Sequence, residues 1–302
     1  MIIRRIKHLF TQPKTSLNNF VVSTKTLWPD KTYLSILFWC QMGNRMNWKN
    51  PKTFSEKIQW LKLYDRRPEY TIMVDKVKAK EYVASILGEK YIIPTLGVWD
   101  DPDKIDFDVL PDRFVMKCNH NSGLGMYICK DKSKMNVEKV KEELRKGLME
   151  NYYIVNREWP YKNVPRRILA EQYIDPDPTA NDLPDFKFFC FNGEPKYCQV
   201  ISGRNEKMCI DFFDKDWNHQ LFHEPREYPF ADITPKRPEH LEQMWDAARQ
   251  LAQNKPFSRI DFYDVNGHVY FGEITFFPTT GMGGFDPVEY DSIMGGMIQL
   301  PK

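Results

Sequence analysis

Several features are missing from this sequence of 302 residues, and each absence excludes a class of protein. No apolar run approaches the roughly 18 residues of a membrane-spanning helix. The six cysteines form neither a C-x-x-C pair nor a zinc-ligand spacing, so reduced thiols are the simplest interpretation. No G-x-S-x-G motif occurs, and no cysteine is matched with a histidine as a nucleophile would be. The balance of 43 Lys and Arg against 41 Asp and Glu gives no overall charge signal for nucleic acid.

The composition fits a folded protein of one large domain or of two to three lobes. The chain is 42% hydrophobic and 14% aromatic, which is ample for a core. The segment from Met1 to Phe10 is basic and amphipathic, but it lacks the long apolar stretch and cleavage site of a secretory signal. It could lie on a membrane surface or pack its Ile and Leu side chains on the protein body. We therefore expect a cytoplasmic protein, with peripheral attachment at the inner face of the membrane as the alternative.

The order of the expected elements indicates an α+β fold with more than one lobe. Residues 1–70 are expected to be mostly helical, and Thr53-Phe54-Ser55-Glu56 has the sequence of a capping box that starts a helix. Apolar stripes at helical spacing predict further helices over 134–150 and 241–251. Strands are predicted at residues 91–99, 114–117, 126–130, 167–174, 186–191, 196–201 and 208–213.

The most informative segment is a predicted hairpin over residues 257–278. Asn266-Gly267 marks its turn, and both flanks alternate as half-buried strands do. The even-numbered positions are apolar and the odd-numbered ones are polar. The apolar residues are Ile260, Phe262, Ile274 and Phe276, and the polar residues are Arg259, Asp261, Glu273 and Thr275.

The register of this hairpin follows from the need to keep the two faces separate. A turn made of Asn266-Gly267 alone would pair odd positions with even ones. We therefore predict a three-residue loop, Val265-Asn266-Gly267, with Gly267 as a left-handed bulge residue. Arg259 then lies opposite Glu273, and Asp261 lies diagonal to it. Two carboxylates and a guanidinium on one face can hold Mg²⁺ beside phosphates, although a surface salt bridge between strands would look the same.

A second segment combines a lysine with a glycine loop. Lys117 ends a predicted strand, and a loop with Ser122, Gly123 and Gly125 leads to the next one. Glycines allow backbone N–H groups to wrap a phosphate, and the lysine supplies a positive charge. No G-K-[ST] sequence opens a helix here, so this is not a Walker A loop. Many ordinary hairpin loops also contain Gly-x-Gly.

Other charged residues stand where a ligand could reach them. Lys76 is at a predicted helix start, where it could contact a phosphate or be a solvated lysine. Glu171-Gln172-Tyr173-Ile174 ends a strand and could read an adenine edge, or it could be an ordinary strand end. Asp185 and Lys187 alternate with phenylalanines and are expected to face away from the core. Arg204 lies on a short loop, where it could bind an anionic substrate or remain solvated.

Taken in this order, these residues resemble the ATP-grasp superfamily. The set consists of Asp75-Lys76, Lys117 before the glycine loop, Glu171-Gln172-Tyr173-Ile174, Asp185, Arg259-x-Asp261 and Glu273-x-Thr275. Between residues 33 and 290 the chain is more closely similar to the teichuronopeptide-biosynthesis (TupA-like) ATP-grasp family. The phrases that carry this resemblance are Asn50-Pro51-Lys52-Thr53-Phe54-Ser55-Glu56-Lys57, Trp60-Leu61-Lys62-Leu63-Tyr64-Asp65, Lys117-Cys118-Asn119-His120, Arg157-Glu158-Trp159-Pro160-Tyr161, Asp185-Phe186-Lys187-Phe188-Phe189-Cys190-Phe191-Asn192-Gly193-Glu194-Pro195 and Gly272-Glu273-Ile274-Thr275-Phe276.

The resemblance implies an ATP-grasp fold, in which two α+β lobes clasp ATP. It implies a helical N-terminal extension in residues 1–70 and an ATP-grasp-associated segment in residues 71–112. A small lobe with the glycine loop would follow in residues 113–170. Residues 171–302 would form a large lobe that carries the metal-binding hairpin.

The resemblance also assigns roles to the site residues. The residues expected to bind ATP are Lys76, Lys117, Ser122, Gly123, Gly125, Glu171, Gln172, Tyr173, Ile174, Asp185 and Lys187. The expected Mg²⁺ ligands are Asp261, Glu273 and Thr275. The expected catalytic residues are Arg259, Lys117 and Arg204, of which Arg259 would steady the acyl-phosphate and the transferred phosphoryl group.

Members of the superfamily typically use ATP and Mg²⁺ to activate a carboxylate as an acyl-phosphate, which an amine then attacks. The resemblance therefore implies an ATP-dependent ligase that forms a carbon–nitrogen bond. Close relatives are associated with surface polysaccharides, which suggests a uronic acid joined to an amino acid or amino alcohol. The implied partners are a small-molecule or glycan carboxylate and an amine, with no nucleic acid. Association with the membrane or with polysaccharide assembly is a further expectation.

One residue departs from the superfamily pattern. The position two residues after the metal-binding Glu is usually Asn, and here it is Thr275, whose hydroxyl can bind Mg²⁺ directly or through water. Two other activities stay open, a phosphotransferase acting on a sugar or glycan and a non-catalytic binding protein on the same scaffold. The non-catalytic alternative is disfavoured because the set of expected site residues is intact, namely Lys76, Lys117, Arg259, Asp261 and Glu273.

Overall fold

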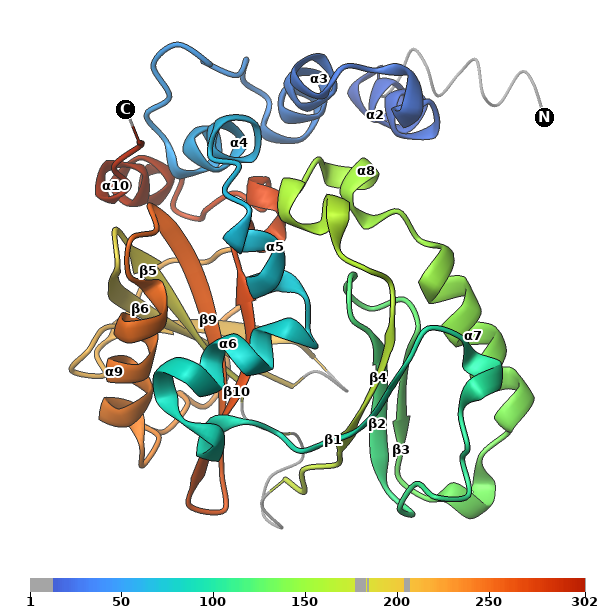
Figure 1. Ribbon diagram of the computed structural model, residues 1–302. Helices are drawn as coiled ribbons and strands as arrows, with labels where there is room; N and C mark the ends of the chain where they lie inside the picture. The colour runs from blue at the N-terminus through green and yellow to red at the C-terminus, as the bar shows by residue number, and fades with distance from the viewer. Residues whose placement is uncertain (1–12, 177–182, 184, 204–206, 302) are drawn as a thin grey trace.

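The computed structural model describes residues 13–176, 183, 185–203 and 207–301. Two antiparallel sheets with helices around them form this part of the chain, which confirms the predicted α+β class. Figure 1 shows the two sheets side by side, with the N-terminal helices α2 to α4 above them. No helix among the described residues is both long and apolar enough to cross a membrane.

The smaller sheet has four strands in the order β1-β4-β2-β3, and the larger has six in the order β10-β9-β5-β6-β7-β8. The strands are β1 (Thr95–Trp99), β2 (Phe114–Cys118), β3 (Met126–Cys129), β4 (Ile168–Gln172), β5 (Asp185–Phe191), β6 (Glu194–Ser202), β7 (Cys209–Phe213), β8 (His219–Gln220), β9 (Phe257–Val265) and β10 (His268–Thr275). The α-helices are α2 (Pro13–Ser23), α3 (Asp30–Met42), α4 (Phe54–Tyr64), α5 (Glu69–Val74), α6 (Lys78–Leu87), α7 (Val137–Met149), α8 (Tyr152–Asn156), α9 (Leu241–Ala252) and α10 (Glu289–Met297). The 3₁₀ turns are η1 (Lys25–Leu27), η2 (Glu89–Tyr91), η3 (Pro102–Lys104), η4 (Lys132–Lys134), η5 (Trp159–Asn163) and η6 (Pro278–Gly281).

The larger sheet is buried on both faces, which explains why the second half of β5, from Phe188 to Phe191, is apolar at every position. Phe188 packs edge-on against Trp245 of α9, with ring centroids 5.5 Å apart. Phe189 points to the opposite face because neighbouring strand residues alternate, and there it contacts Phe257 at 5.8 Å. Phe54 of α4 covers that second face, at 5.0 Å from Phe257. The N-terminal extension is therefore part of the core of the larger sheet.

The predicted capping box at the start of α4 is confirmed. The Thr53 hydroxyl accepts from the Glu56 backbone N–H, and the Glu56 carboxylate accepts from the Thr53 backbone N–H. The helix is also tied to the C-terminal α10, because Asp291 accepts from the Ser55 backbone N–H at 2.8 Å. The predicted domain boundaries stay predictions, and β4 crosses the one between residues 170 and 171.

The predicted register of the β9–β10 hairpin is wrong. His268 pairs with Val265, so the turn has only two residues, Asn266 and Gly267, with φ of 52° and 74°. Such a left-handed pair matches the twist of the strands and is the favoured hairpin turn. The extra residue that separates the two faces is Gly272, where the register shifts.

The consequence of this shift is a different pairing at the polar face. Glu273 lies opposite Asp261, and Thr275 lies opposite Arg259. A side chain at Gly272 would crowd the neighbouring strand, because a Cβ there would lie 3.1 Å from the Asp261 carbonyl oxygen. The prediction that the polar residues share one face nevertheless holds.

Candidate active site

The polar face of the β9–β10 hairpin carries a network centred on Arg259. Its Nε and Nη2 donate to the two carboxylate oxygens of Asp261, both at 2.8 Å, in a bidentate pair. Nη2 also donates to Glu273 Oε1 at 3.0 Å and to Thr275 Oγ1 at 3.2 Å. The Thr275 hydroxyl donates to Glu273 Oε1 at 3.2 Å. The sequence prediction that these four side chains gather on one face is confirmed.

The neighbouring strand β5 extends this network. Lys187 pairs with Asp261 across the β5–β9 ladder, and its Nζ bonds the Asp261 carboxylate. Lys187 also bridges to Asp185, at 2.7 Å. Asp185 and Lys187 do lie on the face of β5 opposite to Phe186 and Phe188, as expected, but that face is covered as well, so both side chains are buried. We call Arg259, Asp261, Glu273, Thr275, Asp185 and Lys187 the charged cluster.

The smaller sheet contributes a second group of charges. Glu171 on β4 accepts from Lys117 on β2 and, at 2.6 Å, from Lys80 on α6. Lys117 and Glu171 meet because β2 and β4 are adjacent, with Val115 paired to Glu171. The sequence does not predict the role of Lys80, since nothing in it marks a helical lysine as a partner for a distant strand. We call Lys76, Lys80 and Lys117 the lysine group.

Lys76 is held near the end of β2 by a buried asparagine. The Asn119 side chain donates to Asp75 at 2.7 Å and to the Pro165 carbonyl at 2.9 Å, and its oxygen accepts from the Arg167 backbone N–H at 2.7 Å. The Lys76 backbone N–H donates to the Asn119 carbonyl at 3.2 Å. Asn119 thus joins the turn before α6 to β2 and to the start of β4. The only indication of this role in the sequence was the position of Asn119, two residues after Lys117 at the end of the predicted strand.

The pKa of Glu273 links the lysine group to the charged cluster. Burial raises this pKa, but Arg259, Lys76, Lys187 and Lys117 outweigh burial and lower it to about 2. The carboxyl is therefore ionised at neutral pH. Burial lowers the pKa of Lys76, while the charge of Glu273 raises it. Charged residues of the smaller sheet and of the larger sheet therefore act on the same carboxylate, Glu273.

The glycine loop between β2 and β3 has two different glycine environments. Gly123 has φ of 89°, and a Cβ added there would meet no other atom within 4 Å. Gly125 has φ of 71°, and a Cβ there would lie 2.7 Å from Cys118 Sγ and 2.9 Å from the Gly147 Cα. Packing against α7 therefore already demands glycine at position 125. Ser122 is exposed beside Gly123, so this part of the loop is open to a ligand.

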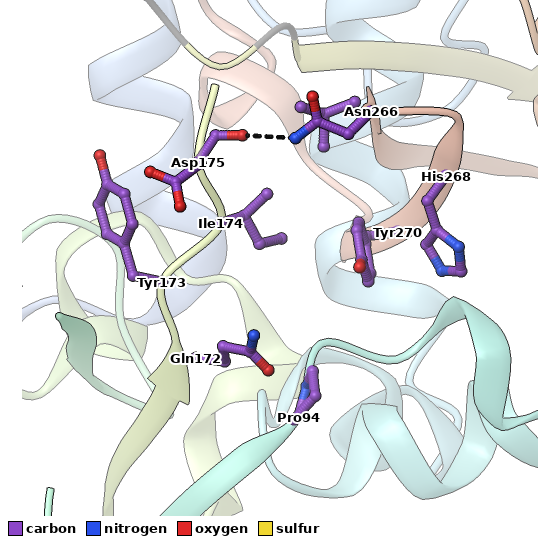
Figure 2. Close-up of a pocket in the computed structure, with 9 residues that line it drawn as sticks. Pro94, Gln172, Tyr173, Ile174, Asp175, Asn266, His268 and Tyr270 are labelled. Carbon is purple, nitrogen blue, oxygen red and sulfur yellow. Dashed lines mark hydrogen bonds between the residues drawn. The ribbon is translucent and has the colours of Figure 1, made fainter. Parts of the chain in front are cut away.

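The segment after β4 borders a pocket of about 220 Å³. Figure 2 shows Ile174 on the side that faces Tyr270 of β10, while Tyr173 lies on the other side. Tyr173 stacks under the Arg113 guanidinium, 4.6 Å from the ring centroid. Asn266 donates to the Asp175 carbonyl at 3.2 Å, which ties the hairpin turn to this segment (Figure 2). Gln172 also lines the pocket, and its backbone N–H donates to the Pro94 carbonyl at 3.0 Å.

The charged cluster has the donor types that suit Mg²⁺. Asp261 is buried, whereas the Glu273 side chain is 37% exposed and can reach a ligand. Within the described part of the chain, no three His, Cys, Asp or Glu side chains are arranged to hold a metal ion on their own. Magnesium at nucleotide sites is typically bound by one or two carboxylates, with phosphates and water completing the shell. The two carboxylates and the Thr275 hydroxyl fit that pattern. Arg204 lies outside the described residues.

Residues 56–299 match the TupA-like ATP-grasp family. No curated protein shows significant sequence similarity to the chain.

Similar solved structures include two D-alanine–D-alanine ligases. The one from Bacillus anthracis, complexed with ATP, is 14% identical with a TM-score of 0.44, over 75% of this chain and 65% of that one. The one from Helicobacter pylori is 13% identical with a TM-score of 0.42, over 83% of this chain and 70% of that one. The chain thus spans about two thirds of the length of these ligases.

The family match covers most of the chain, including the charged cluster and the lysine group. It confirms the family and the ATP-grasp fold predicted from the sequence, and it supports the predicted class of ATP-dependent ligase. The chain therefore belongs to the TupA-like ATP-grasp family.

Proposed function

We propose that the protein is an ATP- and Mg²⁺-dependent carboxylate–amine ligase that works through an acyl-phosphate. The observation that carries this proposal is the opposition of two charge groups. Asp261 and Glu273 lie side by side on β9 and β10, and the charges of Lys76 and Lys117 act on Glu273 from the smaller sheet. Carboxylates can bind a metal ion, and lysines that face them can bind phosphates, so the two groups together suit a metal–nucleotide complex.

In this proposal the triphosphate of ATP lies between the lysine group and the charged cluster. Lys76 and Lys117 neutralise phosphate oxygens, and the exposed part of the glycine loop at Ser122 and Gly123 supplies backbone N–H groups. Asp261, Glu273 and Thr275 would hold Mg²⁺, which would draw charge from the phosphates as they react. Since Asp261 already binds Arg259 and Lys187, Glu273 offers the more accessible carboxylate.

The base of ATP is proposed to lie against residues 171–174. The pocket in Figure 2 borders this segment and reaches Tyr270 on β10. Tyr270 is three residues before Glu273, which corresponds to about 10 Å along a strand. An extended nucleoside triphosphate can span that distance, so Tyr270 borders the base while Glu273 stands at the phosphates.

The chemistry then needs no protein nucleophile. An oxygen of the substrate carboxylate attacks the γ-phosphorus and ADP leaves, which gives an acyl-phosphate. The amine attacks the acyl carbon, loses a proton and displaces phosphate. Arg259 is always charged, and its bidentate hold on Asp261 fixes it where negative charge develops. Positioning and charge neutralisation supply the rate.

The finer substrate assignment rests on the resemblance to proteins of surface-polysaccharide synthesis. We propose a uronic acid as the carboxylate and an amino acid or amino alcohol as the amine. A cytoplasmic location, where ATP is available, fits this activity.

The decisive experiment is calorimetric titration of MgATP into wild-type protein, Asp261→Asn and Glu273→Gln. We expect Mg²⁺-dependent binding in wild type and its loss in both variants, because each removes one of the two carboxylates. Glu239→Gln, an exposed change outside the site, is the control and should bind like wild type. Thermal unfolding of each variant checks the fold.

Turnover separates the ligase from a sugar kinase. A ligase releases ADP and phosphate only when uronate and amine are both present, whereas a kinase leaves the phosphate on its product. Wild-type-like MgATP binding in both carboxylate variants would refute the site assignment.

A further inference from the structure

The buried carboxylate of Glu171 is shared by two lysines that are held to different degrees. The Lys80 amine lies 2.6 Å from Glu171 Oε1, and the Lys117 amine bonds Oε2. Lys80 also donates to the Ile93 carbonyl oxygen at 2.6 Å and to the Thr95 hydroxyl at 3.0 Å. Among the described residues, Glu171 is the only partner of the Lys117 amine. An ammonium group has three N–H donors, so Lys117 keeps two of them for a ligand.

Exposure separates the two lysines in the same way. The Lys117 side chain is 23% exposed and lies near the end of β2, just before the glycine loop. The side chains of Lys80 and Glu171 are only 12% and 5% exposed. Lys117 can therefore turn toward a ligand in the space between the sheets, whereas Lys80 is fixed by its three partners.

Lys80 reaches Glu171 from the side of the larger sheet. Its neighbours on α6, Ala79 and Val83, are buried in the core of the larger sheet, and α6 lies beside β10 (Figure 1). Glu171 belongs to β4, which lies between β1 and β2 in the interior of the smaller sheet. The pair therefore fixes the Glu171 carboxylate relative to both sheets.

The Glu171 carboxylate does not border the pocket proposed for the base of ATP. That pocket is lined by Gln172 and the three residues after it, but not by Glu171. Both Glu171 oxygens already bind lysines, so the amino group of adenine would have to compete with two positive charges for them. The carboxylate is thus engaged with the lysine that is proposed to bind a phosphate.

A nucleotide that draws Lys117 away changes the charge balance at Glu171. Burial raises the pKa of Glu171, but Lys117 and Lys80 outweigh burial and lower it. When Lys117 turns to a phosphate, Lys80 still keeps the carboxylate paired. Without Lys80 the same movement would leave a buried carboxylate with no partner, which is strongly unfavourable.

We propose that Lys80 is a positioning residue for nucleotide binding, which holds the buried Glu171 carboxylate so that Lys117 can bind a phosphate of ATP. Glu171 sets the position of Lys117 and does not read the adenine. This inference rests on the proposed function, because it takes the phosphates to lie at Lys117. It adds a residue that controls ATP binding without touching ATP.

The test is calorimetric titration of MgATP at pH 7 in two buffers of different ionisation enthalpy, which gives the affinity and the number of protons taken up on binding. We expect Lys80→Met to bind MgATP at least about tenfold more weakly than wild type. Binding to this variant should also take up as much as about one extra proton, because a buried carboxylate that loses its last cation becomes protonated.

A double variant separates this role from a merely structural one. Lys80→Met/Glu171→Gln contains no carboxylate that needs a partner, so it should recover most of the lost affinity and take up no extra proton. Lys78→Met is the matched control, since Lys78 is exposed on the same helix and pairs with Glu81. It should behave like wild type in both buffers. If thermal unfolding shows that Lys80→Met is not folded, Lys80→Gln removes the same charge and keeps an N–H donor.

Glu171→Gln alone tests which residue reads the base. We expect this variant to keep the wild-type ratio of MgATP affinity to MgGTP affinity, because the Glu171 side chain does not contact the base. A loss of that ratio would make Glu171 the reader of the adenine and would overturn the inference.

The remaining outcomes each contradict a different step. Wild-type affinity and proton uptake in Lys80→Met would remove Lys80 from nucleotide binding. Weaker binding without extra proton uptake would mean that the charge of Lys80 acts directly on the phosphates. A double variant that binds as weakly as Lys80→Met would show that the loss does not pass through Glu171. If wild type itself does not bind MgATP, the nucleotide site of the proposed function fails, and this inference fails with it.

Discussion

Glu224 is a buried carboxyl group whose ionisation should weaken the fold. It lies in the long connection between β8 and α9 and is 2% exposed. One carboxylate oxygen accepts from the Thr279 hydroxyl, and the other has no partner among the described residues. Burial raises the pKa of Glu224 from 4.5 to about 7, although Thr279 and Arg259 act to lower it.

The size and sign of the effect follow from this pKa. The folded protein binds the proton more tightly than the unfolded chain does, so the stabilisation is complete below pH 4.5 and is lost as pH rises through 7. A difference of roughly 2.5 pKa units at 1.36 kcal/mol per unit gives a loss of about 3 kcal/mol at pH 8. Glu224→Gln cannot ionise and can still accept from Thr279. It should therefore be more stable than wild type by about 3 kcal/mol at pH 8, and by close to nothing at pH 4.5.

The measurement is urea unfolding of both proteins at several pH values between 4.5 and 8, followed by tryptophan fluorescence. The quantity of interest is the difference in unfolding free energy as a function of pH. Glu239→Gln, an exposed change later in the same connection, is the control and should give a difference that does not vary with pH. A pH-independent difference for Glu224→Gln as well would refute the reasoning, because it would mean that Glu224 does not titrate in this range.

Two further substitutions test how the N-terminal extension is held. Lys62→Met should lower the unfolding free energy by about 3 kcal/mol. The reason is that the buried Lys62 amine donates to the Thr280 carbonyl oxygen at 2.7 Å and to the Thr280 hydroxyl at 2.6 Å. An unchanged urea midpoint would show that these two acceptors find other partners. Gly295→Ala should cost about 1–3 kcal/mol, because a Cβ there would lie 2.2 Å from the Lys52 carbonyl oxygen. The melting temperature reports the latter loss, and an unaltered value would mean that α4 and α10 can separate freely.

The parts of the fold that local chemistry determines could be predicted from the sequence. The capping box at Thr53 and the alternation in the hairpin both depend on residues close together in the chain. The hairpin register failed because two solutions keep its faces separate, one with the extra residue in the turn and one with it in the strand. The protein adopts the second solution, with the extra residue at Gly272, where the absence of a side chain allows the backbone to approach Asp261 closely. The sequence contains both glycines and does not rank them.

The residues of the charged cluster could be named from the sequence, but most of their partners could not. Glu171 meets Lys80 and Lys117 only because β4 inserts between β1 and β2 and α6 packs nearby. That order depends on contacts between residues far apart in the chain. The burial of Lys187 has the same origin. Its alternation with phenylalanine correctly put it on the opposite face, but the sequence could not show that this face is covered as well.

The charges between the two sheets give a physical reason for a nucleotide to bind there. The cations are Lys76, Lys80, Lys117, Lys187 and Arg259, and the carboxylates are Glu171, Asp185, Asp261 and Glu273. Five positive charges thus face four negative ones. Lys76 is the least compensated in contacts: its amine donates to the Asn121 carbonyl, and burial together with Lys117 lowers its pKa. A phosphate oxygen beside Lys76 would supply the full negative charge that a carbonyl dipole cannot. The site is therefore arranged so that an anion relieves a cost already present in the folded protein.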